Sequence, residues 1–579
     1  MTVLLDERLP RTLDALVKAW ARPETRGTRL EGWLFEDREA RHRAEAQLAR
    51  AGVLTRLRSA YKPLVHAFLE DIPTKGLKSV RVTYPVHPEA DPRRFLLESY
   101  PLAALLGNID LAFEPGAADL TYVVRTETLD GRTAEHNVFA PNRLHPNHLG
   151  GTDLSPTGWL KATHRPSGQP DLDERLGTDA EALFGRVMEA VAGHSWPEQE
   201  PYCETLSIEV ATPGIERALP YGDEVMSTRE ALHEDLYFSL LEWFKQRSGR
   251  PPEDRGVKPG RIVPDVRAGE GDPHVRVVLH RLGEGAEPAR PDRDIETADG
   301  ALSLRQIERE LASLAGDRIE GRSREGRPIR GLYRWGSRPA ILVTAGQHAN
   351  ETSGPVGALR AAARLLDDPE AHVAVVPLEN PDGYALHARL CEANPRHMHH
   401  AARYTALGND LEYGSPEYEI DARCQGIALS DAKLHINLHG YPAHEWTRPF
   451  TGYLPRGFEL WTIPKGFFLI MRHHAEWASP ARALVEGVAE RLAEVPGLLA
   501  FNARQLEVYA LHSGSAPYEM LHGIPCLVAE DARSPVPMTL ITEFPDETIY
   551  GEAFRFAHEV QMWAVLAAEE AHAGVMAGA

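Results

Sequence analysis

The chain has 579 residues, too many for a single hydrophobic core, so we expect two or more domains. Its apolar content of 43% and charged content of 25% are ordinary for a globular protein, and a net charge of −21 argues against nucleic acid and anionic membranes as partners. Its four cysteines include no CxxC pair, which argues against a disulfide framework and a thiolate zinc site, and we recognise neither a signal peptide nor a membrane-spanning run, so we expect a cytoplasmic protein.

Residues 1–300 predict an N-terminal α+β accessory domain, whose role the sequence does not define. Residues 1–70 show mainly helical spacing, residues 78–139 show strand patterns, and residues 140–159 read as a long irregular loop. Further on we expect helices over 181–192 and 228–245, the second strongly amphipathic, with a strand over 204–211. A polar stretch rich in proline and glycine then predicts a domain boundary near residue 300.

Residues 301–579 alternate between helical patterns and short buried strands. This alternation predicts an α/β fold with a mixed, largely parallel sheet covered by helices on both faces. We expect strands over 330–335, 340–344, 372–377, 433–438, 503–509 and 525–529, and helices over 304–315, 356–366, 480–494 and 551–570.

Several of these strands end in polar residues. His348 and Glu351 lie where a strand turns into a helix, His439 directly follows an apolar run, and Glu530 ends another. In open α/β sheets ligands bind at the carboxyl ends of the strands. An ionised carboxylate at the end of a buried run needs a partner or a function. Nitrogen and oxygen donors together suit zinc, so these strand ends predict a metal site.

The order of the motifs resembles that of the zinc metallocarboxypeptidases of the M14 type. The similarity runs through GRSREGRPI, AGQHANE, ENPDGY, RYTALGNDL and LHGY, and continues in GIPCLVAED and EFPDETI. It covers about residues 303–570 and keeps the family's order and rough spacing. The resemblance therefore implies a zinc carboxypeptidase-like fold for residues 301–579.

Carried over residue by residue, the resemblance makes His348, Glu351 and His439 the ligands of one zinc ion per chain, with water in the open position. His435, on the same strand as His439, is the competing histidine. Glu530 is implied as the general base that activates the zinc-bound water, and Glu543 is its rival.

Two further residues are implied to act on the substrate. Arg403 matches the arginine that steadies the developing oxyanion, with Arg396 as the alternative. Tyr509 matches the tyrosine that closes over the substrate. The nearby loop histidines are expected to be solvated rather than to hold a second metal; they are His397, His399 and His400.

The predicted function is that of a zinc-dependent hydrolase cleaving an amide or peptide bond, most simply a carboxypeptidase acting on a peptide or an acylated amino acid. One departure stands out, because Glu412 and Tyr413 occupy the place of the family's Asn-Arg pair that binds the terminal carboxylate. An acidic side chain there would repel a carboxylate. Either another arginine substitutes, or the enzyme is an amidase or deacylase that does not read a free C-terminus; the arginines considered are Arg423, Arg448 and Arg456. A non-catalytic binding protein is the third hypothesis, and the intact set of ligands and base counts against it.

Overall fold

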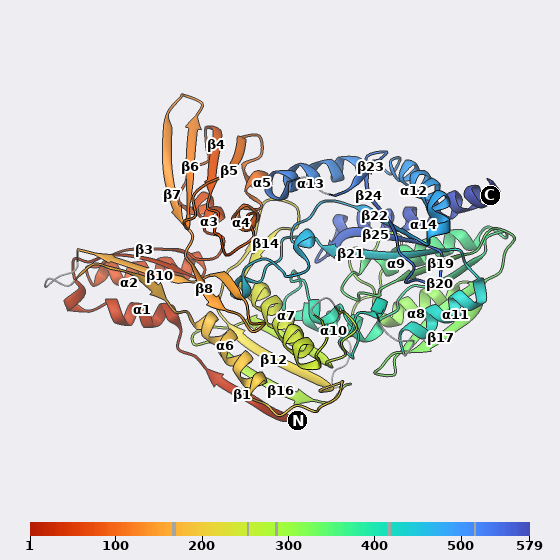
Figure 1. The fold of residues 1–579 in the computed structure, drawn as a ribbon, viewed down its shortest axis with the longest axis horizontal. Coiled ribbons are helices and arrows are strands. Elements are labelled where there is room, and N and C mark those ends of the chain that lie inside the picture. Colours follow the sequence, from red (N-terminus) through yellow and green to blue (C-terminus); the bar gives the residue numbers. More distant parts are fainter. Residues whose placement is uncertain (165–169, 252–253, 284–287, 414–417, 515–516, 579) are drawn as a thin grey trace.

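A computed structural model describes the chain except for residues 165–169, 252–253, 284–287, 414–417, 515–516 and 579 (Figure 1). Its second half is built on one nine-stranded sheet with the strand order β17-β18-β20-β19-β21-β25-β22-β24-β23. The strands are β17 (Asp317–Arg322), β18 (Pro328–Arg334), β19 (Ile341–Ala345), β20 (Val373–Val376), β21 (Leu434–Pro442), β22 (Phe468–His473), β23 (Glu519–Leu521), β24 (Ile524–Glu530) and β25 (Met538–Glu547).

The centre of this sheet is parallel, and its outer pairs are antiparallel except for the parallel pair of β22 and β24. Strand β19 pairs in parallel with β20 and β21, and β21 pairs in parallel with β25. Antiparallel pairing begins at β18 on one side and at β22 on the other. The predicted mixed α/β sheet is therefore confirmed.

Helices cover both faces of the sheet, which explains why its central strands are apolar throughout. Successive side chains of a strand point to opposite faces, so Ile341 and Val343 belong to one hydrophobic cluster and Leu342 to another. The first cluster includes α9 and α14, and the second includes Ala422 of α11. The helices of this half are α8 (Leu304–Ser313), α9 (Ser353–Leu366), α10 (Pro381–Ala393), α11 (Ile420–Ser430), α12 (Ala478–Leu492), α13 (Leu498–Ser513) and α14 (Glu552–Gly578).

The predicted strand over residues 503–509 is wrong, because these residues lie inside helix α13. Seven residues of alternating character were too short a pattern to distinguish the two structures. The surrounding sequence LLAFNARQLEVYALHS is rich in good helix formers, which favours one long helix.

The first 280 residues form several smaller sheets, consistent with the expected α+β character (Figure 1). The four-stranded sheets have the orders β1-β16-β12-β15, β11-β10-β2-β3 and β5-β4-β6-β7. Their strands are β1 (Thr2–Arg8), β2 (Arg29–Leu34), β3 (Leu54–Ser59), β4 (Leu77–Tyr84), β5 (Asp110–Pro115), β6 (Thr121–Thr128), β7 (Thr133–Phe139), β10 (Gly158–Thr163), β11 (Leu172–Leu176), β12 (Thr205–Thr212), β15 (Arg261–Ala268) and β16 (His274–His280).

Shorter hairpins and helices complete this half. Strands β8 and β9 pair within residues 140–159, so the irregular loop predicted there is wrong; the turn around Asn147 closes a hairpin. Strands also interrupt residues 1–70, where mainly helix was expected. The remaining elements are β8 (Asn142–Pro146), β9 (Thr152–Pro156), β13 (Glu216–Ala218), β14 (Val225–Ser227), α1 (Thr12–Trp20), α2 (Arg38–Arg50), α3 (Pro63–Glu70), α4 (Arg94–Glu98), α5 (Leu102–Leu106), α6 (Asp179–Ala192) and α7 (Thr228–Ser248).

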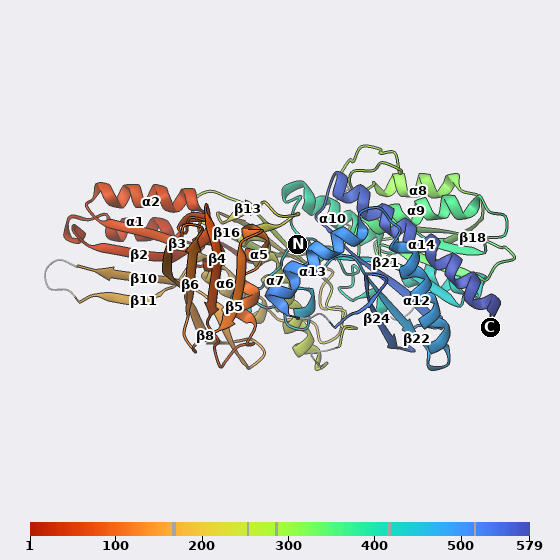
Figure 2. The same cartoon turned by 90° about the horizontal axis from the view of Figure 1, so that it is seen from above.

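Helix α7 joins the two halves of the molecule, and it lies between them in both views (Figures 1 and 2). It was expected to be amphipathic, yet both its apolar and its polar residues are buried, among them Glu230, Glu234 and Asp235. These acids meet polar groups of the second half: Asp235 accepts from the backbone N–H of Phe450 at 2.7 Å. We propose that the domain boundary lies near residue 300. One hydrophobic cluster nevertheless contains residues from both sides of this boundary, among them Leu236 and Trp446. Among the described residues no helix combines the length and apolarity needed to cross a bilayer.

Candidate metal centre and active site

Two neighbouring strands bring His348, Glu351 and His439 together. Strands β19 and β21 are parallel neighbours, so the turn after β19 and the end of β21 meet at one edge of the sheet. That turn needs Gly346, which has a φ of +63° and whose added Cβ would lie 2.5 Å from Leu378 Cδ1. Within the described residues these three side chains form the one group that could hold a metal ion, with ligand atoms all within 4.8 Å of one another.

The distances within the cluster fit a shared cation. Glu351 lies 2.8 Å from His348 Nδ1 and 3.1 Å from His439 Nδ1, and the two Nδ1 atoms are 3.0 Å apart. All three residues are buried, and Glu351 Oε2 has no hydrogen-bond partner in the described part of the chain. Two imidazoles and a carboxylate are one of the donor sets found in three-ligand catalytic zinc sites. The cluster therefore fits one zinc ion.

The electrostatics of the cluster also favour a positive charge. Burial and Arg403 lower the pKa of His348, but the carboxylates of Glu351 and Asp410 outweigh them and raise it to about 9. Asp410 Oδ1 lies 3.6 Å from His348 Nε2 and accepts a hydrogen bond from the backbone N–H of Glu412 at 3.0 Å. Such carboxylates beside metal-binding histidines fix the orientation of the ring.

Arg403 lies directly beside the cluster. Its Nη1 donates to Glu351 Oε1 at 2.8 Å and lies 3.7 Å from a carboxylate oxygen of Glu547. The alternative, Arg396, is half exposed and lies 3.6 Å from Asp223 instead. His435, the competing histidine on β21, lies 2.8 Å from Thr344 Oγ1 within the sheet and is outside the cluster.

The structure does not bring Glu530 to this site. Glu530 ends β24, is exposed, and pairs with His473 of β22. In the sheet order, β25 and β22 separate β24 from β21. At about 4.8 Å per strand, three steps place β24 about 14 Å from His439, too far for a group that must reach the metal centre.

Glu543, the rival carboxylate, lies in the required place. It is the direct partner of His439 in the pairing of β21 with β25, and it lines the same cavity. Its side chain is buried, and Oε2 has no hydrogen-bond partner among the described residues. Burial, reinforced by the negative charge of Glu351, raises the pKa of Glu543 well above its usual value.

A cavity of about 90 Å³ adjoins the cluster and has aromatic and charged walls. Its residues include Tyr441, Trp446, Phe458, Trp461, Arg255, Arg403, Arg472, Asp410, Glu412, His400 and Glu543. Tyr509 is absent from this lining; it is buried on α13, in a cluster with Tyr100 and Ile463. The role expected for Tyr509 thus lacks support in the geometry.

An acidic residue lies in the cavity where the resemblance would place the carboxylate-binding Asn-Arg pair. Glu412 lines the cavity and forms an ion pair with Arg472. The three substitute arginines considered from the sequence do not line it: Arg423 donates to Glu379, and Arg448 and Arg456 both donate to Glu242. Residues 414–417 and the side chain of Tyr413 lie outside the described part. Arg472 and Arg255, which the motif order gave no reason to single out, are the arginines that line the cavity beside Arg403.

The expectation that the loop histidines are solvated is wrong. His397, His399 and His400 are all buried. His397 Nε2 lies 2.9 Å from Glu216, and His400 Nδ1 lies 2.5 Å from Glu234. Because these partners belong to the first 300 residues, the sequence around the loop histidines gave no sign that they would be buried.

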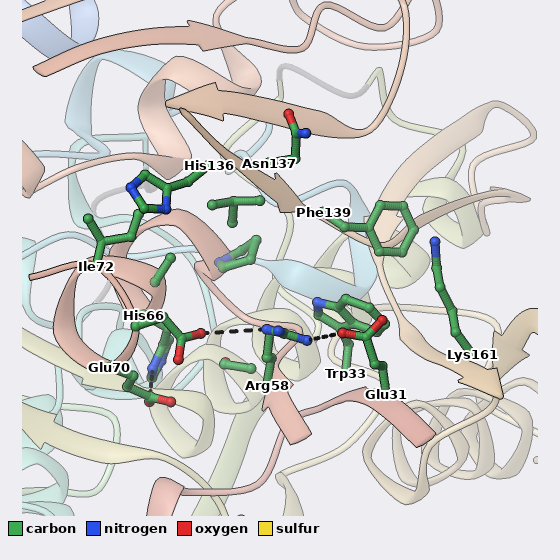
Figure 3. Close-up of a pocket in the computed structure, with 15 residues that line it drawn as sticks. Glu31, Trp33, Arg58, His66, Glu70, Ile72, His136, Asn137, Phe139 and Lys161 are labelled. Carbon is green, nitrogen blue, oxygen red and sulfur yellow. Dashed lines mark hydrogen bonds and ion pairs between the residues drawn. The ribbon is translucent and has the colours of Figure 1, made fainter. Parts of the chain in front are cut away.

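A larger cavity of about 520 Å³ lies in the N-terminal half, between β3 and β7 (Figure 3). Several of its charged groups already pair with one another, as Figure 3 shows for Arg58 with Glu31 and for His66 with Glu70. None of its lining residues belongs to the candidate metal cluster. The smaller cavity, which adjoins that cluster, is therefore the candidate active site.

Comparison with known proteins agrees with this location. The family model described as "Zinc carboxypeptidase" (Peptidase_M14) matches residues 304–441, which include all three candidate ligands. No curated protein matches.

Among solved structures, the chain is similar to three metallocarboxypeptidase structures at low TM-scores. That of Burkholderia cenocepacia is 13% identical, with 52% of this chain and 76% of that chain covered and a TM-score of 0.29. The enzyme of Pseudomonas aeruginosa is 16% identical over 52% and 71% of the chains, with a TM-score of 0.28. Carboxypeptidase A of Helicoverpa armigera is 10% identical over 53% and 90%, with a TM-score of 0.29.

Proposed function

Residues 304–441 carry the zinc carboxypeptidase family match, and from this premise we propose that the chain is a zinc-dependent hydrolase of amide or peptide bonds. The observation that carries the proposal is the buried group of His348, Glu351 and His439 with the carboxylate of Glu543 on the neighbouring strand. A hydrolase of this kind needs a metal with an open position and a nearby base.

We assign zinc to the three ligands and the role of base to Glu543. When bound, zinc supplies Lewis acidity and lowers the pKa of water toward about 7. Glu543 takes a proton from the attacking water and delivers it to the leaving nitrogen, a shuttle for which its place beside His439 is suited. Asp410 and Arg403 keep His348 and Glu351 in position.

Arg403 is proposed to stabilise the negative charge that develops on the substrate carbonyl oxygen. An Arg403→Ala substitution is expected to lower kcat about 10²–10³-fold, the usual effect of removing one such group. Steady-state kinetics of the zinc-loaded variant measure this. Arg396→Ala is the matched control, because Arg396 lies at Asp223 and should retain parental rates. Equal losses in the two variants would contradict the role.

A carboxypeptidase is the first candidate, and Glu412 in the cavity wall favours a second, an amidase or deacylase. An N-acyl dipeptide and its C-terminal amide distinguish them. A carboxypeptidase should prefer the free acid at least about tenfold in kcat/KM, whereas repulsion by Glu412 should make the amide the better substrate.

The proposal as a whole predicts about one zinc per purified chain by elemental analysis and hydrolysis of at least one of the two probes. A metal-replete chain that holds zinc but cleaves neither probe, nor any member of a peptide library, would instead favour a binding protein.

A further inference from the structure

One histidine of the cavity wall is held by the N-terminal half of the chain. His400 lies in the short helical turn His400–Ala402, and its Nδ1 is 2.5 Å from Glu234 Oε2 of α7. Glu234 is fully buried, and the His400 ring packs against Phe238 of the same helix and against Trp446. The ring is thus fixed on three sides, by one hydrogen bond and two aromatic contacts.

The opposite nitrogen of this ring is available to a ligand. His400 lines the metal-centre cavity together with His348, His439 and Glu543. Its Nδ1 is engaged by Glu234, so Nε2 is the nitrogen left to meet a ligand in the cavity. An imidazole fixed by one nitrogen has a defined tautomer, because the group bonded to Nδ1 decides which nitrogen carries the proton.

The surroundings favour the uncharged form of both partners of the pair. Burial, with the nearby carboxylates of Glu230 and Glu547, raises the pKa of Glu234 well above its usual value. Burial and the positive charge of Arg403 lower the pKa of His400 well below its usual value. In the arrangement that these shifts favour, Glu234 donates to Nδ1, and a neutral ring then carries its hydrogen on Nε2, the nitrogen opposite this contact.

We propose that His400 is a substrate-binding residue whose Nε2–H donates to an oxygen of the bound peptide or acylated amino acid, and that Glu234 is its positioning residue. The inference deepens the proposed hydrolase function and rests on it. The oxygen is a carbonyl or a carboxylate, since only an acceptor can pair with this N–H. The N-terminal half therefore takes part in substrate recognition through α7.

The test measures substrate binding apart from turnover. In a Glu543→Gln background loaded with zinc, titration calorimetry with an N-acyl dipeptide gives the Kd. Adding His400→Phe, which keeps the ring but removes both nitrogens, is expected to raise the Kd about tenfold, the cost of one hydrogen bond to substrate. The His400→Phe single variant, which retains Glu543, should show a matching rise in KM and a kcat within about twofold of the parent's.

His399→Phe is the matched control, because His399 is the adjacent buried histidine, is bonded to Asn394 O, and does not line the cavity. It should leave the Kd unchanged. Glu234→Leu should reproduce the weaker binding, whereas Glu234→Gln should restore it, because an amide N–H can still donate to Nδ1. Zinc content and thermal unfolding of each variant establish that the chain is folded.

Two outcomes separate the inference from the function on which it rests. An unchanged Kd in His400→Phe, or an equal change in His399→Phe, overturns the inference while the hydrolase stands. If the zinc-loaded parent binds and cleaves no peptide or acyl amino acid, the proposed function falls and the inference with it.

Discussion

A Glu543→Gln substitution is expected to lower kcat/KM by about 10³-fold or more while the chain keeps its zinc. Glu543 is the buried carboxylate that pairs with His439 across β21 and β25, and an amide of the same shape cannot accept a proton. General acid–base catalysis contributes about 10²–10⁴ in rate, so the loss should be unmistakable. Steady-state kinetics on the better of the two dipeptide probes, with elemental analysis of the same samples, measure it.

Glu530→Gln is the control for this experiment. The same chemical change is made at the exposed end of β24, and it should leave kcat/KM within about twofold of the parent. A large loss in Glu530→Gln with parental activity in Glu543→Gln would return the role of base to Glu530. Loss of zinc from Glu543→Gln would mean instead that this residue serves as a ligand.

Glu530 and Glu543 show which part of the candidate site could be predicted from the sequence and which part could not. The convergence of the three candidate ligands was predictable because His348 and Glu351 lie at a strand–helix junction and His439 ends a strand, and parallel strands bring such ends to one edge. The place of Glu543 beside them was not predictable, because β25 follows β24 in the chain but lies between β21 and β22 in the sheet. The order of the strands in the sheet decides which carboxylate lies beside the candidate ligands, and the spacing of motifs in the sequence does not contain that order.

The N-terminal half illustrates a second limit. Residues 228–245 were correctly predicted to be helical, but the helix was expected to be strongly amphipathic. Instead Glu230 accepts from His444 and the backbone of Met398, and Glu234 meets His400, all from the second half. A buried charge is recognisable in a sequence only if its partner is known, and these partners are about 165 to 215 residues away.

Removing the metal is the other change with a large expected effect. Chelation should abolish hydrolysis and lower the melting temperature, because it leaves two imidazole nitrogens 3.0 Å apart around a buried carboxylate. A ligand present at 1,000 times its Kd stabilises the folded state by about 4 kcal/mol, which corresponds to a shift on the order of 10 °C for a domain of this size. Calorimetric melting with and without a chelator, followed by return of zinc, measures both effects.

Substitution of one candidate ligand should lower activity and melting temperature in a way that added zinc does not reverse. In His439→Ala, added zinc is expected to restore neither activity nor melting temperature, since two ligands hold the ion far less tightly than three. His435→Gln is the matched change on the same strand: His435 is bonded to Thr344, outside the cluster, and this variant should still bind one zinc. If chelation leaves the parent's melting temperature unchanged, or if His439→Ala binds zinc as well as His435→Gln does, the metal is not held by these three residues.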